Sequence, residues 1–247
     1  MASTELAQEE EKVEPLLISP EEYLRIEELV EVRLEYANGK VIPKEGSEPL
    51  PDWVVRELLH PDFDEKTLDF EFPMATRKHA HLIRNIQREL TLSLQDNESV
   101  VIYGQDPQIY IALTGKYRVP DVTISPEVAQ QKFEKNSLTN PIAIFEVLSP
   151  STAPKDHSEK LDEYLSIESL QEYFLVSQDE VKIERYRRAE GKRWEYEAFR
   201  EEPLPVSSVA LALDIEKVYK DVFDGGHLPV SRRMQYIFVA KSGSLST

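Results

Sequence analysis

Hydrophobic residues recur along this chain in the two spacings that are typical of helices and strands. One helix is predicted to begin at Pro20, because Ser19 and Glu22 match the capping box that starts many helices. A second helix is predicted from Thr76, with a single buried face. That face consists of Ile83, Ile86, Leu90 and Leu94. The charged residues mostly outside it are Arg84, Arg88 and Glu89.

Segments with a strand-like pattern make up much of the remaining chain. Asn38 and Gly39 separate two of them and are typical of a hairpin turn. A helix is predicted at 155–166 and a last short helix within 211–222. The predicted strands are 32–36, 40–42, 100–103, 108–113, 117–124, 141–148, 173–176, 181–187 and 194–199. This order excludes a helix bundle or a sandwich and predicts an α/β or α+β domain with a central mixed β-sheet flanked by helices.

The predicted domain spans residues 18–223 of the 247-residue chain. Residues 1–17 form an acidic N-terminal tail, and 224–247 form a C-terminal tail of undefined structure. Residues 43–73 are rich in proline and acids, so we interpret them as an extended excursion with one short helix near 54–59. Either the excursion or the C-terminal tail is long enough to cover a site or to form a dimer contact.

The charge of the chain restricts its partners. It has 29 basic and 46 acidic residues and a formal net charge of −17. A protein that coats nucleic acid usually presents a broad basic surface. This chain must gather its basic residues locally, recruit cations, or bind something else.

Three sequence features indicate a cytoplasmic protein. Cysteine is absent, which excludes disulfides, thiolate metal sites and cysteine nucleophiles. No apolar run approaches the roughly 20 residues of a membrane span. The acidic N-terminus also differs from a signal or transit peptide.

Two carboxylates lie in apolar strand sequences. Glu146 shares a strand face with Ile144 and Leu148, where losing hydration costs several kcal/mol unless a cation compensates. Asp121 follows Pro120 at the start of another strand. The alternatives are a glutamate that reaches solvent at a strand end and an aspartate in a turn. If the two strands are neighbours, the pair supplies the protein ligands that Mg²⁺ needs.

Lys160 is the candidate cationic group. Asp156 can cap the predicted helix, and Lys160 lies near its start, where the helix dipole disfavours a lysine. Its stem is long enough to reach back to the sheet. The alternative is a solvated lysine paired with Asp156.

These residues together resemble a known family. The strings Arg118-Val119-Pro120-Asp121-Val122 and Phe145-Glu146-Val147-Leu148-Ser149-Pro150-Ser151-Thr152, followed by Asp156, Lys160, Tyr164 and Glu172-Tyr173, are similar to the Uma-two-type family of restriction-endonuclease-like proteins. That family belongs to the PD-(D/E)XK nuclease superfamily. Glu35-Tyr36, Asn38-Gly39-Lys40 and His79 extend the resemblance over roughly residues 18 to 222.

The resemblance implies a nuclease site. Asp121, Glu146 and the Val147 carbonyl would ligate Mg²⁺ or Mn²⁺, which would bind the scissile phosphate and activate water. Lys160 would orient that water or neutralise developing charge. Glu35, His79 and Asp156 match positions near the site, although a local hydrogen bond is the alternative for His79.

The sequence departs from the family pattern in two respects. The excursion at 43–73 and the tail after Asp224 are longer than the pattern requires. The usual lysine of the superfamily lies two residues after the glutamate, where this chain has Leu148, so Lys160 is expected to replace it.

Three functions follow from this sequence. The first is a metal-dependent endonuclease with a nucleic acid, expected to be DNA, as its substrate. The second is a nucleic-acid or protein binding module that keeps the fold without turnover, which the acidic charge and Leu148 favour. The third, a purely structural dimer, leaves the two carboxylates unexplained. Related nucleases are often dimers, so a homodimer remains an alternative to a monomer.

Overall fold

The computed structural model describes residues 15–149, 158–191 and 193–223. Helix α1 (Pro20–Glu27) begins with the predicted capping box. The Ser19 hydroxyl accepts a hydrogen bond from the Glu22 N–H at 3.2 Å, and the Glu22 carboxylate accepts one from the Ser19 N–H at 2.7 Å. The predicted hairpin is also confirmed: β1 (Leu34–Ala37) pairs antiparallel with β2 (Lys40–Pro43). Asn38 and Gly39 turn it with φ angles of 54° and 79°.

Residues 43–73 contain the predicted short helix. It is α2 (Asp52–Leu58), and a 3-10 turn, η1 (Glu65–Thr67), follows it. Val54, Val55 and Leu58 pack against the hairpin and α1 in one buried cluster. This segment is therefore part of a core.

Helix α3 (Arg77–Ser93) follows, with the Thr76 side chain capping its start. Its buried face consists of Leu82, Ile86 and Leu90, with Leu94 just beyond the helix. Two residues of this helix differ from the prediction, which placed Ile83 on the buried face and Glu89 outside it. Ile83 is only partly buried, and Glu89 is buried instead of exposed, because Arg88 and Lys217 contact it at 3.7 and 3.8 Å.

The larger of two six-stranded sheets carries the residues of most interest. β9 and β10 are parallel, and the other pairs are antiparallel, so the sheet is mixed. Its strands in spatial order are β12 (Trp194–Phe199), β11 (Ile183–Arg188), β10 (Glu172–Ser177), β9 (Ala143–Leu148), β6 (Val122–Pro126) and β3 (Val100–Tyr103).

The predicted single strand at 117–124 is wrong. Val119-Pro120-Asp121 interrupts it, and Pro120 has no N–H with which to continue a ladder. The two halves, β5 (Lys116–Arg118) and β6, belong to different sheets. The second sheet also contains short strands that the sequence did not predict. It has the order β2-β1-β5-β4-β8-β7. β4 (Ile109–Ile111) lies within the predicted strand 108–113, and the strands without a prediction are β7 (Phe133–Glu134) and β8 (Ser137–Leu138).

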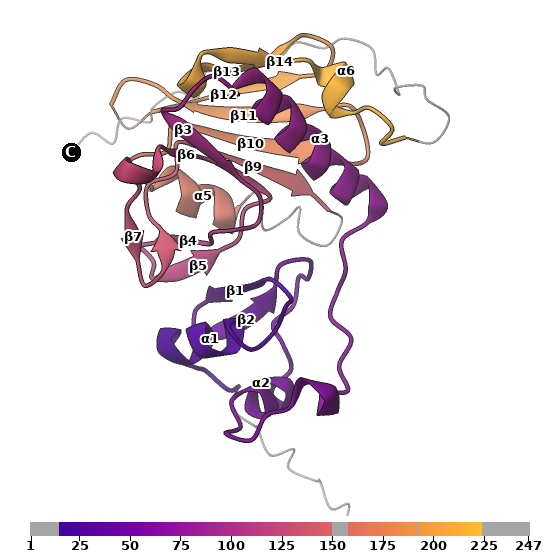
Figure 1. The fold of residues 1–247 in the computed structure, drawn as a ribbon, viewed down its shortest axis with the longest axis vertical. Helices are drawn as coiled ribbons and strands as arrows, with labels where there is room; N and C mark the ends of the chain where they lie inside the picture. The colour runs from indigo at the N-terminus through magenta and orange to yellow at the C-terminus, as the bar shows by residue number, and fades with distance from the viewer. Residues whose placement is uncertain (1–14, 150–157, 192, 224–247) are drawn as a thin grey trace, which may run out of the picture.

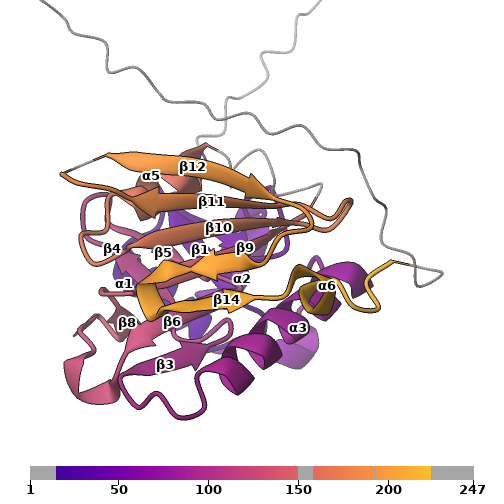
Figure 2. The ribbon, with the colours of Figure 1, turned by 90° about the horizontal axis from the view of Figure 1, so that it is seen from above.

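Helices cover both faces of the large sheet. On one face α3, the hairpin of β13 (Leu204–Val206) and β14 (Leu211–Leu213), and α6 (Ile215–Val218) pack on Phe145 and Val147 of β9. On the other face α5 (Glu159–Leu165) packs on Ile144. Figure 1 shows α1, α2, β1 and β2 grouped at the lower end, and Figure 2 shows β14 and α6 beside α3. Short 3-10 turns lie at Val128–Gln130 and Ser207–Val209.

The predicted fold class is confirmed: strands and helices are mixed, and the sheets are flanked by helices. The difference is that the strands form two large sheets instead of one. Among the described residues, no helix combines the length and apolar character that crossing a bilayer requires.

Candidate metal centre

Asp121 directly precedes β6 and is fully buried. Its Oδ2 accepts a hydrogen bond from the Val147 N–H at 2.7 Å and lies 3.1 Å from His79 Nε2. Its Oδ1 lies 3.4 Å from the Lys44 ammonium. Burial opposes ionisation, but Lys44, His79 and the Val147 N–H outweigh it and hold the pKa of Asp121 well below its usual range. Asp121 is therefore a carboxylate.

Glu146 lies on the adjacent strand, β9, and is also buried. The register pairs Val122 with Phe145, so the strands that carry the two carboxylates are neighbours, as the sequence suggested. Glu146 Oε2 accepts a hydrogen bond from Lys44 Nζ at 2.5 Å, and Oε1 accepts one from the Tyr164 hydroxyl at 3.0 Å. A single buried ammonium thus contacts both carboxylates.

Lys160 of α5 reaches the same place, because α5 packs on the sheet face that carries Ile144 and Glu146. Its side chain is buried, and Nζ lies 3.0 Å from Glu35 Oε1 and 3.7 Å from Glu146 Oε1. Glu35 belongs to β1, and its Oε1 also accepts a hydrogen bond from the Val119 N–H at 3.2 Å. Burial raises the pKa of Glu35, but Lys160, Arg118 and Lys44 outweigh it and lower this pKa to about 2.

Arg118 of β5 connects α5 to the second sheet. Its buried guanidinium lies 3.1 Å from Glu35 Oε2 and 2.7 Å from Glu163 Oε2. Glu163 is one helical turn after Lys160. Arg118 thereby fixes both the glutamate that contacts Lys160 and the helix that carries it.

A second set of ligand atoms surrounds Asp121. Carboxylate oxygens of Glu45 and Asp121 and a ring nitrogen of His79 lie within 4.8 Å of one another, a spacing that could hold a metal ion. His79 Nδ1 lies 3.2 Å from Glu45 Oε2. Burial lowers the pKa of His79, but its contacts with Asp121 and Glu45 raise it to about 10. His79 is thus an imidazolium here. A histidine must be neutral to bind a metal ion, so His79 would have to lose a proton before it could act as a ligand.

The profile of the Uma2 family, described as "Putative restriction endonuclease", matches residues 69–216, more than half of the chain. The chain belongs to the Uma2 family.

Two relatives from Synechocystis sp. (strain ATCC 27184 / PCC 6803 / Kazusa) carry the names "Uncharacterized protein sll1609" and "Uncharacterized protein slr1290". The first is 30% identical over 181 residues, which cover 72% of this chain and 85% of the relative. The second is 26% identical over 206 residues, covering 82% and 92%. The similarity extends over nearly the full length of both relatives.

A solved structure shares the Uma2 chain's fold. It is the crystal structure of "a putative nuclease belonging to DUF820" from Anabaena variabilis ATCC 29413. The TM-score is 0.56 at 19% sequence identity, with 78% of this chain and 93% of that chain covered. At this identity the likeness shows the fold alone. The restriction-endonuclease-like family that the sequence resembled is confirmed, and the description of that family suggests a nuclease.

The structure brings most of the sequence-predicted residues of this Uma2 chain to one place. Asp121, Glu146 and Lys160 lie together there, with Glu35 and His79 in contact with them. The Val147 N–H contacts Asp121, whereas its carbonyl was the group expected to bind metal. Asp156 lies outside the described residues.

Sequence reasoning missed Lys44 and Glu45. They directly follow β2, at the start of the excursion, and both reach Asp121 or its partner His79. It also missed Gln105, whose amide donates to Asp121 Oδ1 at 3.3 Å. The available signal for Lys44 and Glu45 was their position directly after the hairpin that carries Glu35.

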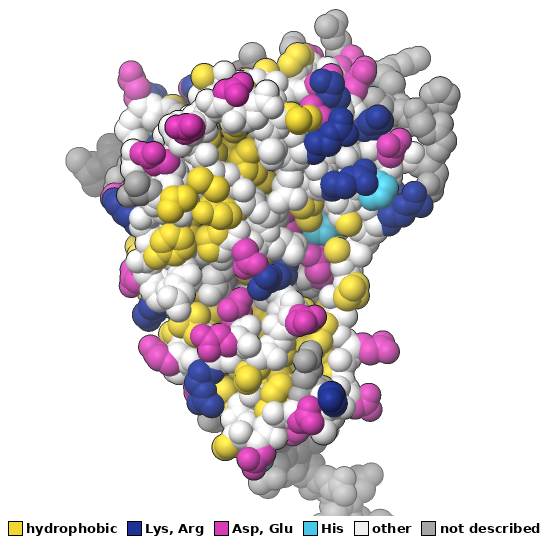
Figure 3. Space-filling view, in the orientation of Figure 1, with side chains coloured by type: hydrophobic (Ala, Val, Ile, Leu, Met, Phe, Trp, Pro, Cys, Tyr) yellow, Lys and Arg dark blue, Asp and Glu magenta, His cyan; other side chains and the backbone are white. Residues whose placement is uncertain are grey.

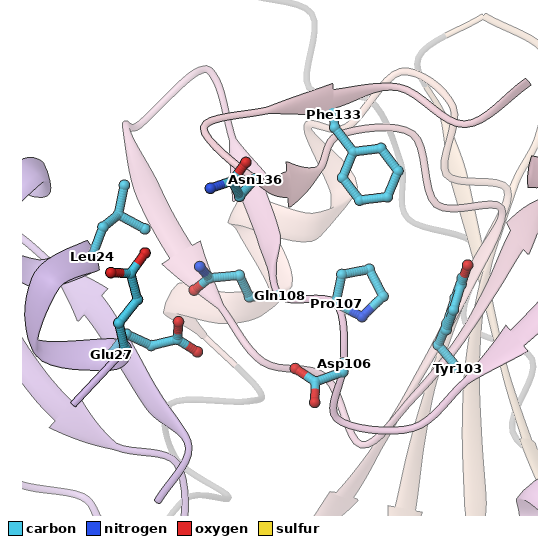
Figure 4. Close-up of a pocket in the computed structure, with 9 residues that line it drawn as sticks. Leu24, Glu27, Tyr103, Asp106, Pro107, Gln108, Phe133 and Asn136 are labelled. Atoms are coloured by element: carbon cyan, nitrogen blue, oxygen red, sulfur yellow. The ribbon is translucent and has the colours of Figure 1, made fainter. Parts of the chain in front are cut away.

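A separate pocket of about 410 Å³ lies between α1, the loop after β3 and the β7–β8 hairpin. Figure 4 shows Leu24 and Glu27 on one side of it, and Tyr103, Pro107 and Phe133 on the other. Its described lining is acidic and contains no lysine or arginine. Such a lining repels phosphate, so this pocket does not share the chemistry of the Asp121 site.

Proposed function

We propose that this protein is a divalent-metal-dependent nuclease that hydrolyses phosphodiester bonds, with DNA as its expected substrate and Asp121 and Glu146 as its metal-binding carboxylates. The observation that carries the proposal is the convergence of these two buried carboxylates on one cation, Lys44 Nζ. A buried pair of acids is costly unless a positive charge lies between them.

The residues present fit a divalent ion. The Lys44 ammonium lies 2.5 Å from a Glu146 oxygen and 3.4 Å from an Asp121 oxygen. The two carboxylates therefore already flank a position that holds a positive charge. Mg²⁺ and Mn²⁺ prefer such oxygen ligands, and Mg²⁺ needs only one or two carboxylates. Asp121, Glu146 and the Val147 carbonyl would hold the ion. When bound, it would act as a Lewis acid toward the phosphate and lower the pKa of water.

Lys160 supplies the second positive charge of the proposed site. Its ammonium lies beside Glu146 but is held mainly by Glu35, which Arg118 and the Val119 N–H fix in turn. A buried donor in this position can orient the attacking water or neutralise charge that develops on the phosphate. This arrangement supplies a lysine although position 148 is Leu148.

One observation favours the second candidate, a binding module without turnover. Lys44 contacts both carboxylates, so a metal ion between them would have to displace its ammonium. If the displacement does not occur, the site is an internal ion-pair cluster that stabilises the fold.

Cleavage of a panel of duplex DNA, single-stranded DNA and RNA, with and without Mg²⁺ or Mn²⁺, tests the proposal. We expect metal-dependent cleavage that falls by at least about 10²-fold in Asp121→Asn and Glu146→Gln. Asp179→Asn and Glu190→Gln are matched controls, because both residues are exposed. Cleavage that persists in the site variants would reveal a contaminating nuclease. Absence of metal-dependent cleavage across the whole panel would refute turnover.

A further inference from the structure

Helix α3 presents a row of basic side chains away from the core. Arg77, His81, Arg84 and Arg88 are spaced by four, three and four positions, which places them on one helix face. The buried residues of α3 occupy the opposite face. The three arginines are exposed.

The segment around α6 widens this row. The Asn85 amide donates to the carbonyl oxygens of Val218 and Lys220 at 2.9 and 2.8 Å, which holds α6 beside α3. Lys217 and Lys220 are exposed there. We call these six residues the basic stripe: Arg77, His81, Arg84, Arg88, Lys217 and Lys220. Figure 3 shows dark blue side chains gathered over this part of the molecule.

Few acids offset the stripe on α3 itself. Its sequence contains four lysine or arginine residues and one acid, Glu89, although acids outnumber basic residues 46 to 29 in the whole chain. Glu89 is buried and contacts Arg88 and Lys217. The exposed acids around α6 are Asp214, Glu216 and Asp221. The local gathering of basic residues is one of the arrangements that a chain with a charge of −17 needs to bind a polyanion.

The stripe and the candidate metal centre are linked by one helix, although they lie on different faces of it. His79, in the first turn of the same helix, contacts Asp121 at 3.1 Å, and Arg77 lies two residues before it. Arg77 and Arg88 are eleven residues apart, or about 17 Å along the helix axis. That length matches roughly five nucleotides of one DNA strand at 3.4 Å each.

We infer that the basic stripe binds the phosphate backbone of the nucleic acid that the Asp121 site acts on. Its arginine and lysine side chains are suited to phosphate, and it needs no base contacts, so binding is independent of sequence. The inference rests on the proposed function, because it assigns the surface along which that substrate lies.

The test measures binding of a fluorescent 20-base-pair DNA duplex by anisotropy, in EDTA and at several salt concentrations. In the full chain, Arg84→Ala/Arg88→Ala should weaken binding about tenfold at low salt and reduce the salt dependence of log K by about two, because two phosphate contacts are lost. The matched control is Arg56→Ala/Lys66→Ala, which removes two exposed positive charges from the α2 region. It should bind like the native protein.

Equal binding by the stripe variant and the native protein, or no binding by the native protein, would overturn the inference. Failure of the proposed function gives a different result: stripe-dependent binding would persist, but no metal would support cleavage. Conversely, cleavage that needs Asp121 but is insensitive to Arg84→Ala/Arg88→Ala would support the nuclease function and refute nucleic-acid binding by the basic stripe.

Discussion

Replacement of Lys44 by methionine distinguishes a metal-binding site from an internal ion-pair cluster. The change removes the ammonium that lies 2.5 Å from Glu146 and 3.4 Å from Asp121, and it keeps an unbranched apolar stem. With an effective dielectric constant of 20, those contacts correspond to gross attractions of about 7 and about 5 kcal/mol before desolvation is counted. Their removal leaves two buried carboxylates without this cation. The metal-free variant should therefore lose about 3–5 kcal/mol of stability.

The same change should strengthen metal binding. In the native protein an ion between Asp121 and Glu146 must first displace the Lys44 ammonium, and a hydrogen bond to a charged group contributes about 1.5–3 kcal/mol net. Removing that competition should tighten Mn²⁺ binding by roughly 10- to 100-fold. The ion should then also restore thermal stability, because it binds the folded state selectively.

Calorimetric titration with Mn²⁺, paired with melting temperatures with and without the ion, measures both effects. Lys66→Met is the matched control, because Lys66 is an exposed lysine. A Lys44→Met variant that binds Mn²⁺ no more tightly than the native protein would refute the reasoning. Lys44 would then be part of the binding site instead of a competitor for it.

Three further changes test the surroundings of the site. Lys160→Met should lower the cleavage rate by about 10²–10³-fold, while the Mn²⁺ dissociation constant changes little. Single-turnover kinetics measures the rate, and calorimetry measures the dissociation constant. Arg118→Met should cost about 3–5 kcal/mol in urea unfolding, because it leaves buried Glu35 and Glu163 without their shared partner. Glu35 has its pKa lowered from 4.5 to about 2, so its contribution of about 3 kcal/mol is present above pH 4.5 and lost as the pH falls toward 2. Glu35→Gln should consequently flatten the acid side of the stability profile, and an unchanged slope between pH 6 and 3 would contradict this.

Local sequence signals predicted the elements that local contacts determine. The capping box at Ser19 and the Asn38-Gly39 turn each depend on residues that are close in sequence, and both are present. The alternating faces of β9 also follow from strand geometry, which is why the burial of Glu146 beside Ile144 could be anticipated.

Contacts between distant residues could not be predicted in this way. Lys44 and Glu146 are 102 positions apart, and no periodicity connects them. The division of the strands into two sheets at Pro120 was missed because strand-forming residues lie on both sides of Pro120 and Asp121. Glu89 was assigned to the solvent-facing side of its helix, since the chain pattern alone does not show that α6 packs there.

Calorimetric titration of the intact native protein and Asp121→Asn with Mn²⁺ tests the central claim most directly. The proposed site predicts saturable binding of the ion by the native protein and its loss in the variant, because Asp121 contributes to both groups of ligand atoms. Native protein that takes up no ion, or Asp121→Asn protein that binds as tightly as the native, would contradict it.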